Sequence, residues 1–352
     1  MYKRIFDTSR LAGAAALVGA AFLAACGDEG KKEQKADAAA QPAAAPAPEK
    51  AQDDGSCRES CCQEFVDRSI FEVADMLRTY VQAPEITESV RLLHELTEKY
   101  LDALYAGKSP SPEDLLYRCR VESKLGDLRA DLQAYDRAAE SYGRVMKTMD
   151  SLPEKLRETV PARRVKSATL AGQAWLALVK GDLDTAQKNA EAALAIDEAL
   201  VEQLTPKQGE TPHPAYESVA RDLMGSYKVR ADILNMREDP EEARDTYKKA
   251  VELAKQLKQG SPETARKLVV VLSALGDLEK QTGNIDKAIE SWFSAAKFCQ
   301  ELAKQSRRDV KAQAVRDFKA LKERIEGAQV EKKAQGKDVQ PTEPLEAPEE
   351  QS

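Results

Sequence analysis

Apolar and small residues recur along the chain with the spacing of an amphipathic helix. Four alanines anchor the pattern, and each is followed by further apolar or aromatic residues four and seven positions later. Positions i, i+4 and i+7 share one face of a helix, so each anchor is predicted to lie on a helix that buries that face. The four sets are Ala138, Tyr142 and Val145; Ala186, Ala190 and Ala193; Ala243, Tyr247 and Ala250; and Ala288, Trp292 and Ala295.

A small residue stands twelve positions before each anchor, on a second predicted helix. Between the two, Gly181-Asp182 and Gly283-Asn284 are typical of a helix end, and Pro240 fits the first position of the following helix. Small side chains let two helices approach closely, so each anchor helix is predicted to pack on the helix before it. The chain lacks useful stretches with strand periodicity, so the predicted class is all-α. The small residues are Gly126, Ala174, Ala231 and Gly276.

The stretch "LSALGDLEKQTGNIDKAIESWFSAAKF", Leu272 to Phe298, resembles a tetratricopeptide repeat (TPR) nearly throughout. The family stacks helix-turn-helix units into a superhelix. The resemblance implies a TPR-like α-α superhelix built from degenerate repeats. Two features depart from the family. The anchors stand 48, 57 and 45 residues apart rather than about 34, and the closing proline is absent after Ala250 and Ala295.

The TPR resemblance also implies a place for a partner. In this family the inner face of the first helix of each unit receives a partner's peptide, whereas the large aromatics of the second helix pack in the core. Tyr142, Tyr247 and Trp292 are therefore expected to be buried. The residues expected in the partner groove are Arg120, Asp127, Trp175, Lys228, Asp232, Asn235, Ser273, Asp277 and Lys280.

The start of the chain has the features of an export signal. A basic beginning is followed by the short apolar run Leu11 to Leu23, which is too short to span a bilayer. The run ends in "LAAC", which resembles a bacterial lipobox and implies cleavage before Cys26 and its lipidation. Lipid chains would hold the mature chain on a membrane. The outer membrane's periplasmic face is the preferred expectation; the inner membrane and the cell surface stay open.

Six segments are predicted from these features. The Ala- and Pro-rich linker has no apolar face to bury, and the Pro- and Glu-rich end is expected to be disordered. The segments are 1–25 (lipoprotein signal peptide), 26–56 (linker that begins at the lipidated cysteine), 57–110 (N-terminal helical pair with a cysteine cluster), 111–305 (TPR-like repeats), 306–327 (capping helix) and 328–352 (disordered acidic tail).

Charge and motifs exclude several classes of function. The net charge is −7, and it falls to about −9 when residues 1–25, which carry three basic residues and one acidic residue, are removed. Nucleic-acid binding needs clustered Lys and Arg, so no nucleic-acid partner is expected. The two histidines, His94 and His213, have no local catalytic signature, and the chain lacks a Gly-rich phosphate loop. We expect neither an enzyme nor a cofactor.

The cysteines allow two interpretations. "CRESCC" places Cys57, Cys61 and Cys62 close together, in a compartment that can oxidise thiols. One of the three is expected to form a disulfide with Cys119, whereas Cys299 is expected to be a buried free thiol. The alternative is a redox or metal-handling role for the cluster, but no second cluster or histidine accompanies it, so no metal site is assigned.

Taken with the resemblances, the sequence predicts a membrane-anchored periplasmic lipoprotein that serves as a protein-interaction or envelope-assembly scaffold. Its expected partner is a protein, bound through a peptide segment or as part of an envelope complex. The alternative function is the redox or metal-handling component with "CRESCC" as its working part.

Overall fold

The computed structural model describes residues 109–206, 211–257, 261–304 and 308–336, together with Lys99 and Leu345. The chain divides into two compact units, Met1–Ser109 and Pro110–Ser352, and the description below concerns the second. The predicted signal peptide, Cys26, the linker and the cluster of Cys57, Cys61 and Cys62 lie outside the described residues.

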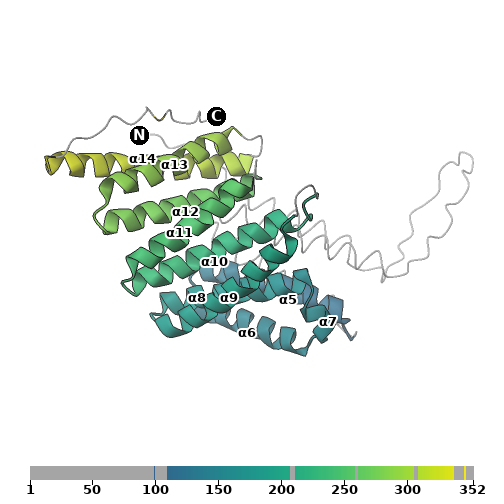
Figure 1. Cartoon of the computed structure of the whole chain (residues 1–352). Coiled ribbons are helices and arrows are strands. Elements are labelled where there is room, and N and C mark those ends of the chain that lie inside the picture. The colour runs from purple at the N-terminus through teal and green to yellow at the C-terminus, as the bar shows by residue number, and fades with distance from the viewer. Residues whose placement is uncertain are drawn as a thin grey trace, which may run out of the picture. The chain divides into compact units, whose positions relative to one another are not determined.

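Within the described part, all regular secondary structure is helical, which confirms the predicted all-α class (Figure 1). Four hairpins of long helices follow one another, and each has a turn of three residues between its helices. The short α7 lies between the first two hairpins, and α14 follows the last. The bounds are α5 Pro112–Asp131, α6 Tyr135–Ser151, α7 Glu154–Arg157, α8 Val160–Val179, α9 Leu183–Leu204, α10 Tyr216–Met236, α11 Pro240–Gln256, α12 Pro262–Gln281, α13 Ile285–Ala303 and α14 Arg308–Ala334.

We call the first helix of each hairpin an A helix (α5, α8, α10, α12) and the second a B helix (α6, α9, α11, α13). Within each hairpin the two helices are in extensive contact, and each A helix also contacts the next A helix along the chain. Helices therefore pack against their neighbours in chain order. In the same described part, no helix is long and apolar enough to cross a membrane.

All four turns use the same backbone device. The middle residue has positive φ: 60° at Gln133, 79° at Gly181, 63° at Glu238 and 81° at Gly283. The next residue then donates its N–H to the carbonyl five positions earlier, as Asn284 does to Glu279 at 2.8 Å. This pattern is the Schellman helix end. The glycine signals predicted two of the turns correctly, and two use Gln and Glu in the left-handed region.

The predicted close approach of the two helices at their small residues is confirmed at Gly126 and Gly276. A Cβ atom added to Gly126 would lie 2.5 Å from the Tyr142 ring, and one added to Gly276 would overlap the Trp292 indole in the same way. Both approaches are too close for carbon atoms, so only glycine fits. The rings themselves are 1% exposed. Gly172 of α8, in the following hairpin, faces the Tyr142 hydroxyl, and a Cβ atom added there would lie 2.5 Å from that oxygen.

The helix α14 extends seven residues beyond the predicted capping helix, to Ala334. Part of the predicted disordered tail is therefore helical. The apolar stripe of α14 continues to Ala328, past residue 327. Beyond it, Lys332 is only 8% exposed and pairs with Asp286 of α13 at 2.5 Å. The stripe consists of Val310, Ala314, Phe318, Leu321, Ile325 and Ala328.

Candidate partner-binding face on the A helices

The predicted groove residues share one sector of the A helices, which we call the A face. Relative to the small residue of their helix they stand at −6, −3, +1 or +4. At about 100° per residue these positions fall within roughly 80° of arc. All nine are at least partly exposed, as the prediction requires. Because successive A helices are in contact, their sectors adjoin.

Three exposed apolar side chains extend this sector, and sequence analysis missed them. Val179 is 44% exposed and Met236 57%, and both stand at +5 on adjacent A helices. Val270 of α12, 46% exposed, stands at −6. The only signal in the sequence was an apolar residue at each of these three positions, which lie on a helix face where polar residues are expected. Of the five exposed large apolar residues in the described part, three thus belong to the A face.

The three predicted groove aspartates also serve the core. The Tyr142 hydroxyl donates to Asp127 Oδ1 at 2.8 Å, the Tyr247 hydroxyl donates to Asp232, and Trp292 Nε1 donates to Asp277 Oδ1 at 3.2 Å. Each aspartate therefore satisfies the polar end of a buried aromatic. Burial, and then the charge of Asp232, raise the pKa of Tyr247. These carboxylates are bound within the protein and are only in part available to a partner.

The hairpin of α8 and α9 lacks this pair. It has Trp175 where the others have aspartate and Ala190 where they have the aromatic. Trp175 is half-buried and packs on Tyr135, with 5.9 Å between ring centroids. The joint occurrence of aspartate and aromatic fifteen residues apart was visible in the sequence, but the contact between them depends on hairpin closure.

The middle of the A face is braced by polar contacts. Lys228 Nζ lies 2.6 Å from Asp232 Oδ2, one turn along α10. Asn235 Nδ2 donates to Gln281 Oε1 at 3.1 Å and so joins α10 to α12. Such partly exposed pairs contribute little to stability, but they hold the side chains of Lys228, Asp232 and Asn235 in one arrangement.

The last hairpin's groove residues are engaged by α14. Arg324 Nη1 donates to Ser273 Oγ at 2.8 Å and to both oxygens of Asp277 at 2.9 Å. Lys280 lies 3.6 Å from Glu331 of the same helix. The α14 helix thus engages polar groups of α12 at this end of the predicted groove. Binding of a partner in the groove stays a prediction. The groove residues of α5, α8 and α10, together with exposed Val270 of α12, form the rest of the A face.

The cysteines within the described part are buried thiols. Cys119 is 2% exposed, is not in a disulfide and contacts the Val145 carbonyl with Sγ at 3.8 Å. The thiol of Cys119 is thus unbridged and covered by α6 in this structure, and a bridge to Cys57, Cys61 or Cys62, which lie outside the described residues, stays a prediction. Cys299 is 0% exposed and free, as predicted. Burial raises the pKa of both thiols to about 12, so neither is a ready nucleophile.

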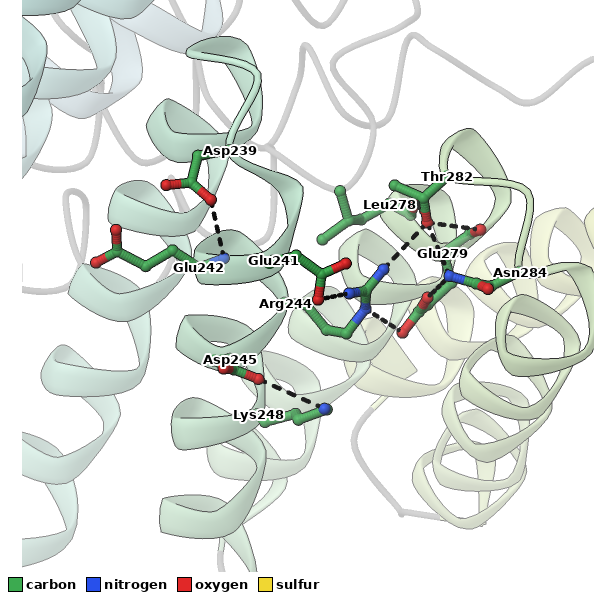
Figure 2. Close-up of polar contacts among 10 residues, drawn as sticks. All are labelled: Asp239, Glu241, Glu242, Arg244, Asp245, Lys248, Leu278, Glu279, Thr282 and Asn284. Carbon is green, nitrogen blue, oxygen red and sulfur yellow. Dashed lines mark hydrogen bonds and ion pairs between the residues drawn. The ribbon is translucent and has the colours of Figure 1, made fainter.

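A buried ion pair joins α11 to the end of α12 (Figure 2). Arg244 Nε donates to Glu279 Oε1 at 2.8 Å, with side-chain exposures of 7% and 3%. Arg244 also donates to Glu241 and Thr282, and Asn284 donates to the second oxygen of Glu279 at 2.9 Å. The hydrogen bond to Glu241, above all, raises the Arg244 pKa. Because these groups satisfy one another, the cluster is structural and not a reactive site.

Comparisons with known proteins add little to this picture. No family model and no curated protein matches the chain. A solved structure described as the crystal structure of BtubC (BKLC) from P. vanneervenii is similar, with 17% sequence identity and a TM-score of 0.39. The match covers 84% of this chain and 99% of that one. The function is therefore inferred from the chain's own sequence and contacts.

Proposed function

We propose that the chain is a lipid-anchored periplasmic protein whose hairpins form a TPR-like superhelix and serve as a scaffold for protein interaction or envelope assembly. The observation that carries this proposal is the A face. It combines half-buried Trp175 with exposed Val179 and Met236 on adjacent A helices. Exposed apolar side chains that gather on one face are typical of interaction sites.

A peptide segment would bind this face in an extended conformation. Its apolar side chains would cover Trp175, Val179 and Met236, and its polar groups would meet Arg120 and Lys228 at the sides. The Lys228–Asp232 pair and the Asn235–Gln281 hydrogen bond hold the face in place before binding, which reduces the entropy that binding costs. Lipidation of Cys26 would keep the encounter at the membrane.

The test is crosslinking in living cells. A photoreactive amino acid is placed at Met236 or Val179, and at Glu290 on the exposed side of α13 as the matched control. We expect one protein to be crosslinked from both A-face positions and not from Glu290. The Trp175→Ala variant should reduce its yield at least about fivefold, because the aromatic is the largest partly exposed contact of the face.

A Cys26→Ala version is tested alongside for localisation. We expect it to lose membrane association while its purified form still binds the same partner through the A face. Equal crosslinking from Glu290 and Met236, or no crosslinked protein at either A-face position, would contradict the scaffold function. Membrane association without Cys26 would contradict the anchor alone.

A further inference from the structure

A groove lies between two B helices, away from the A face. Its walls are α9 and α11 and its floor is α10, and its volume is about 600 Å³. The floor residues Leu223 and Tyr227 stand at −8 and −4 from Ala231. This places them about 160° and 120° around the helix axis from the centre of the A face. Val201 adds apolar surface from the α9 wall, whereas Leu223 and Leu253 are only 4% and 8% exposed and underlie the groove.

The floor is held in position by two adjacent hydrogen bonds. Ser226 Oγ donates to Asp197 Oδ2 at 2.6 Å, and the next residue, Tyr227, donates its hydroxyl to Glu198 Oε1 at 2.9 Å. Burial, and then its bond to Glu198, raise the pKa of Tyr227, so the hydroxyl stays a donor. The ring is therefore fixed along the groove before any ligand arrives.

The two walls differ in charge. On α11, Asp245 lies 3.6 Å from Lys248, and Glu252 lies 2.7 Å from Lys255, so its acidic groups have cationic neighbours. On α9, Glu198 and Glu202 stand one turn apart on the groove; Glu198 accepts the Tyr227 hydroxyl, and neither carboxylate forms a salt bridge within the described part of the chain. The α9 wall thus carries two carboxylates and no cation on the groove, whereas the α11 wall mixes Asp245 and Glu252 with Lys248 and Lys249.

The dimensions suit a helix. The α11 wall contributes residues from Asp245 to Gln256, which span roughly 17 Å at about 1.5 Å per residue. Three turns of a ligand helix match this length. Helices that bind in such grooves present apolar side chains at i, i+4 and i+7.

We propose that this groove binds a basic amphipathic helix of about three turns, supplied by a partner protein. Its aliphatic side chains pack on Tyr227 and Val201, above the buried Leu223 and Leu253, and its Lys or Arg side chains lie against Glu198 and Glu202. This second surface is independent of the A face, so the chain holds two different segments at once: an extended one on the A helices and a helical one here.

The test uses the full chain and three synthetic 14-residue helices at 150 mM salt. The first has leucine on one face and lysine on the other, the second replaces lysine by glutamate, and the third replaces leucine by glutamine. Affinity is measured by fluorescence anisotropy. We expect the Lys/Leu helix to bind at least about tenfold more tightly than either of the others, because it alone matches both floor and wall.

Charge variants locate the site. Glu202→Lys should weaken binding of the Lys/Leu helix about tenfold, and Lys249→Glu, on the opposite wall, should strengthen it several-fold. The matched controls, Glu290→Lys and Lys287→Glu, make the same charge changes on exposed positions of α13 and should change the affinity less than about twofold.

Three results would overturn the proposal. Equal weakening by Glu290→Lys and Glu202→Lys would indicate non-specific attraction of a basic peptide to an acidic protein. Tighter binding of the Glu/Leu helix would indicate an acidic ligand on the α11 lysines. Loss of binding in Met236→Glu would place the peptide on the A face, which would remove this inference and leave the scaffold function standing.

Discussion

At the scale of single residues, one buried carboxyl stands out from its counterparts in the other hairpins. Eleven positions after the anchor alanine, three B helices have Met149, Ala254 and Cys299, whereas α9 has Asp197. Asp197 is 1% exposed, and its Oδ1 atom has no hydrogen-bond partner. Burial raises its pKa to about 6. An acidic side chain thus occupies, where α9 packs on α10, a core position that is apolar in the other three B helices.

Replacing Asp197 by asparagine should stabilise the protein at neutral pH. The folded-state pKa lies above the ordinary value of 3.8, so the folded state binds more protons between about pH 4 and 6, and this carboxyl lowers the free energy of unfolding as pH rises through that range. Arg164 and Asp222 face it from α8 and α10, but they pair with each other at 2.7 Å. We expect a gain of about 1–2 kcal/mol at pH 7.5 and none at pH 4.

Urea unfolding of wild type and Asp197→Asn from pH 4 to pH 8 checks this expectation. The difference between the two curves isolates this carboxyl from other titrating groups. The control is Asp245→Asn, which is exposed on α11. If the free energies of unfolding of the two proteins keep a constant difference from pH 4 to pH 8, ionisation of Asp197 does not lower the stability of the folded state, and the prediction is wrong.

The four turns offer a second residue-scale test. Glu238 has φ of 63°, a conformation that costs a non-glycine residue about 1 kcal/mol. Glu238→Gly should therefore stabilise the protein by about 0.5 kcal/mol, whereas Gly283→Ala should destabilise it by about 1 kcal/mol. Thermal unfolding monitored by circular dichroism measures both. Shifts of the same sign in both variants would contradict the argument.

At the scale of elements, α14 packs on α13 and also engages polar groups of α12 on the A face. Its apolar stripe packs on α13, while Arg324 and Glu331 take up polar groups of α12. The buried stripe dominates the energy of docking, because the ion pairs are exposed: the side chains of Arg324 and Asp277 are 43% and 51% exposed.

The Phe318→Ala and Arg324→Ala variants should separate the contribution of the apolar stripe to stability from that of the ion pairs. Phe318 is 2% exposed, and its truncation leaves a cavity that costs about 3–5 kcal/mol. Arg324→Ala should cost less than about 1 kcal/mol. Chemical unfolding measures both, and Val330→Ala, at a position 66% exposed, is the matched control on the same helix. A cost for Arg324→Ala as large as for Phe318→Ala would mean that ion pairs hold α14 in place.

At the scale of the whole described unit, the apolar core is uneven. One continuous cluster extends from Leu194 of α9 to Ala328 of α14. The earlier hairpins have several smaller clusters instead. Buried polar side chains lie between these, including Thr169, whose hydroxyl donates to Ser123 at 3.0 Å, and Asp197. Because the helices contact mainly their neighbours in chain order, the earlier and later hairpins can differ in stability.

Native-state hydrogen exchange should detect this difference. We expect the amides of α5 and α6 to exchange through openings of lower free energy than those of α12 and α13, by about 2 kcal/mol. The Asp197→Asn variant should raise protection of the amides in α8 to α10. Uniform exchange free energies across the unit would show that it unfolds as one cooperative body.

The sequence by itself determined the helices, their turns and the contacts that lie close in the chain. Periodicity, capping signals and small residues act within about twenty positions, so the hairpins and the burial of Tyr142 and Trp292 could be predicted from them. The TPR-like superhelix and the anchor at Cys26 stay predictions. Only the tertiary structure decided which helix faces stay open. Arg324 reaches Asp277 across 47 residues, and Tyr227 meets Glu198 across 29. Such contacts depend on how hairpins stack, because stacking brings together residues that no local pattern relates.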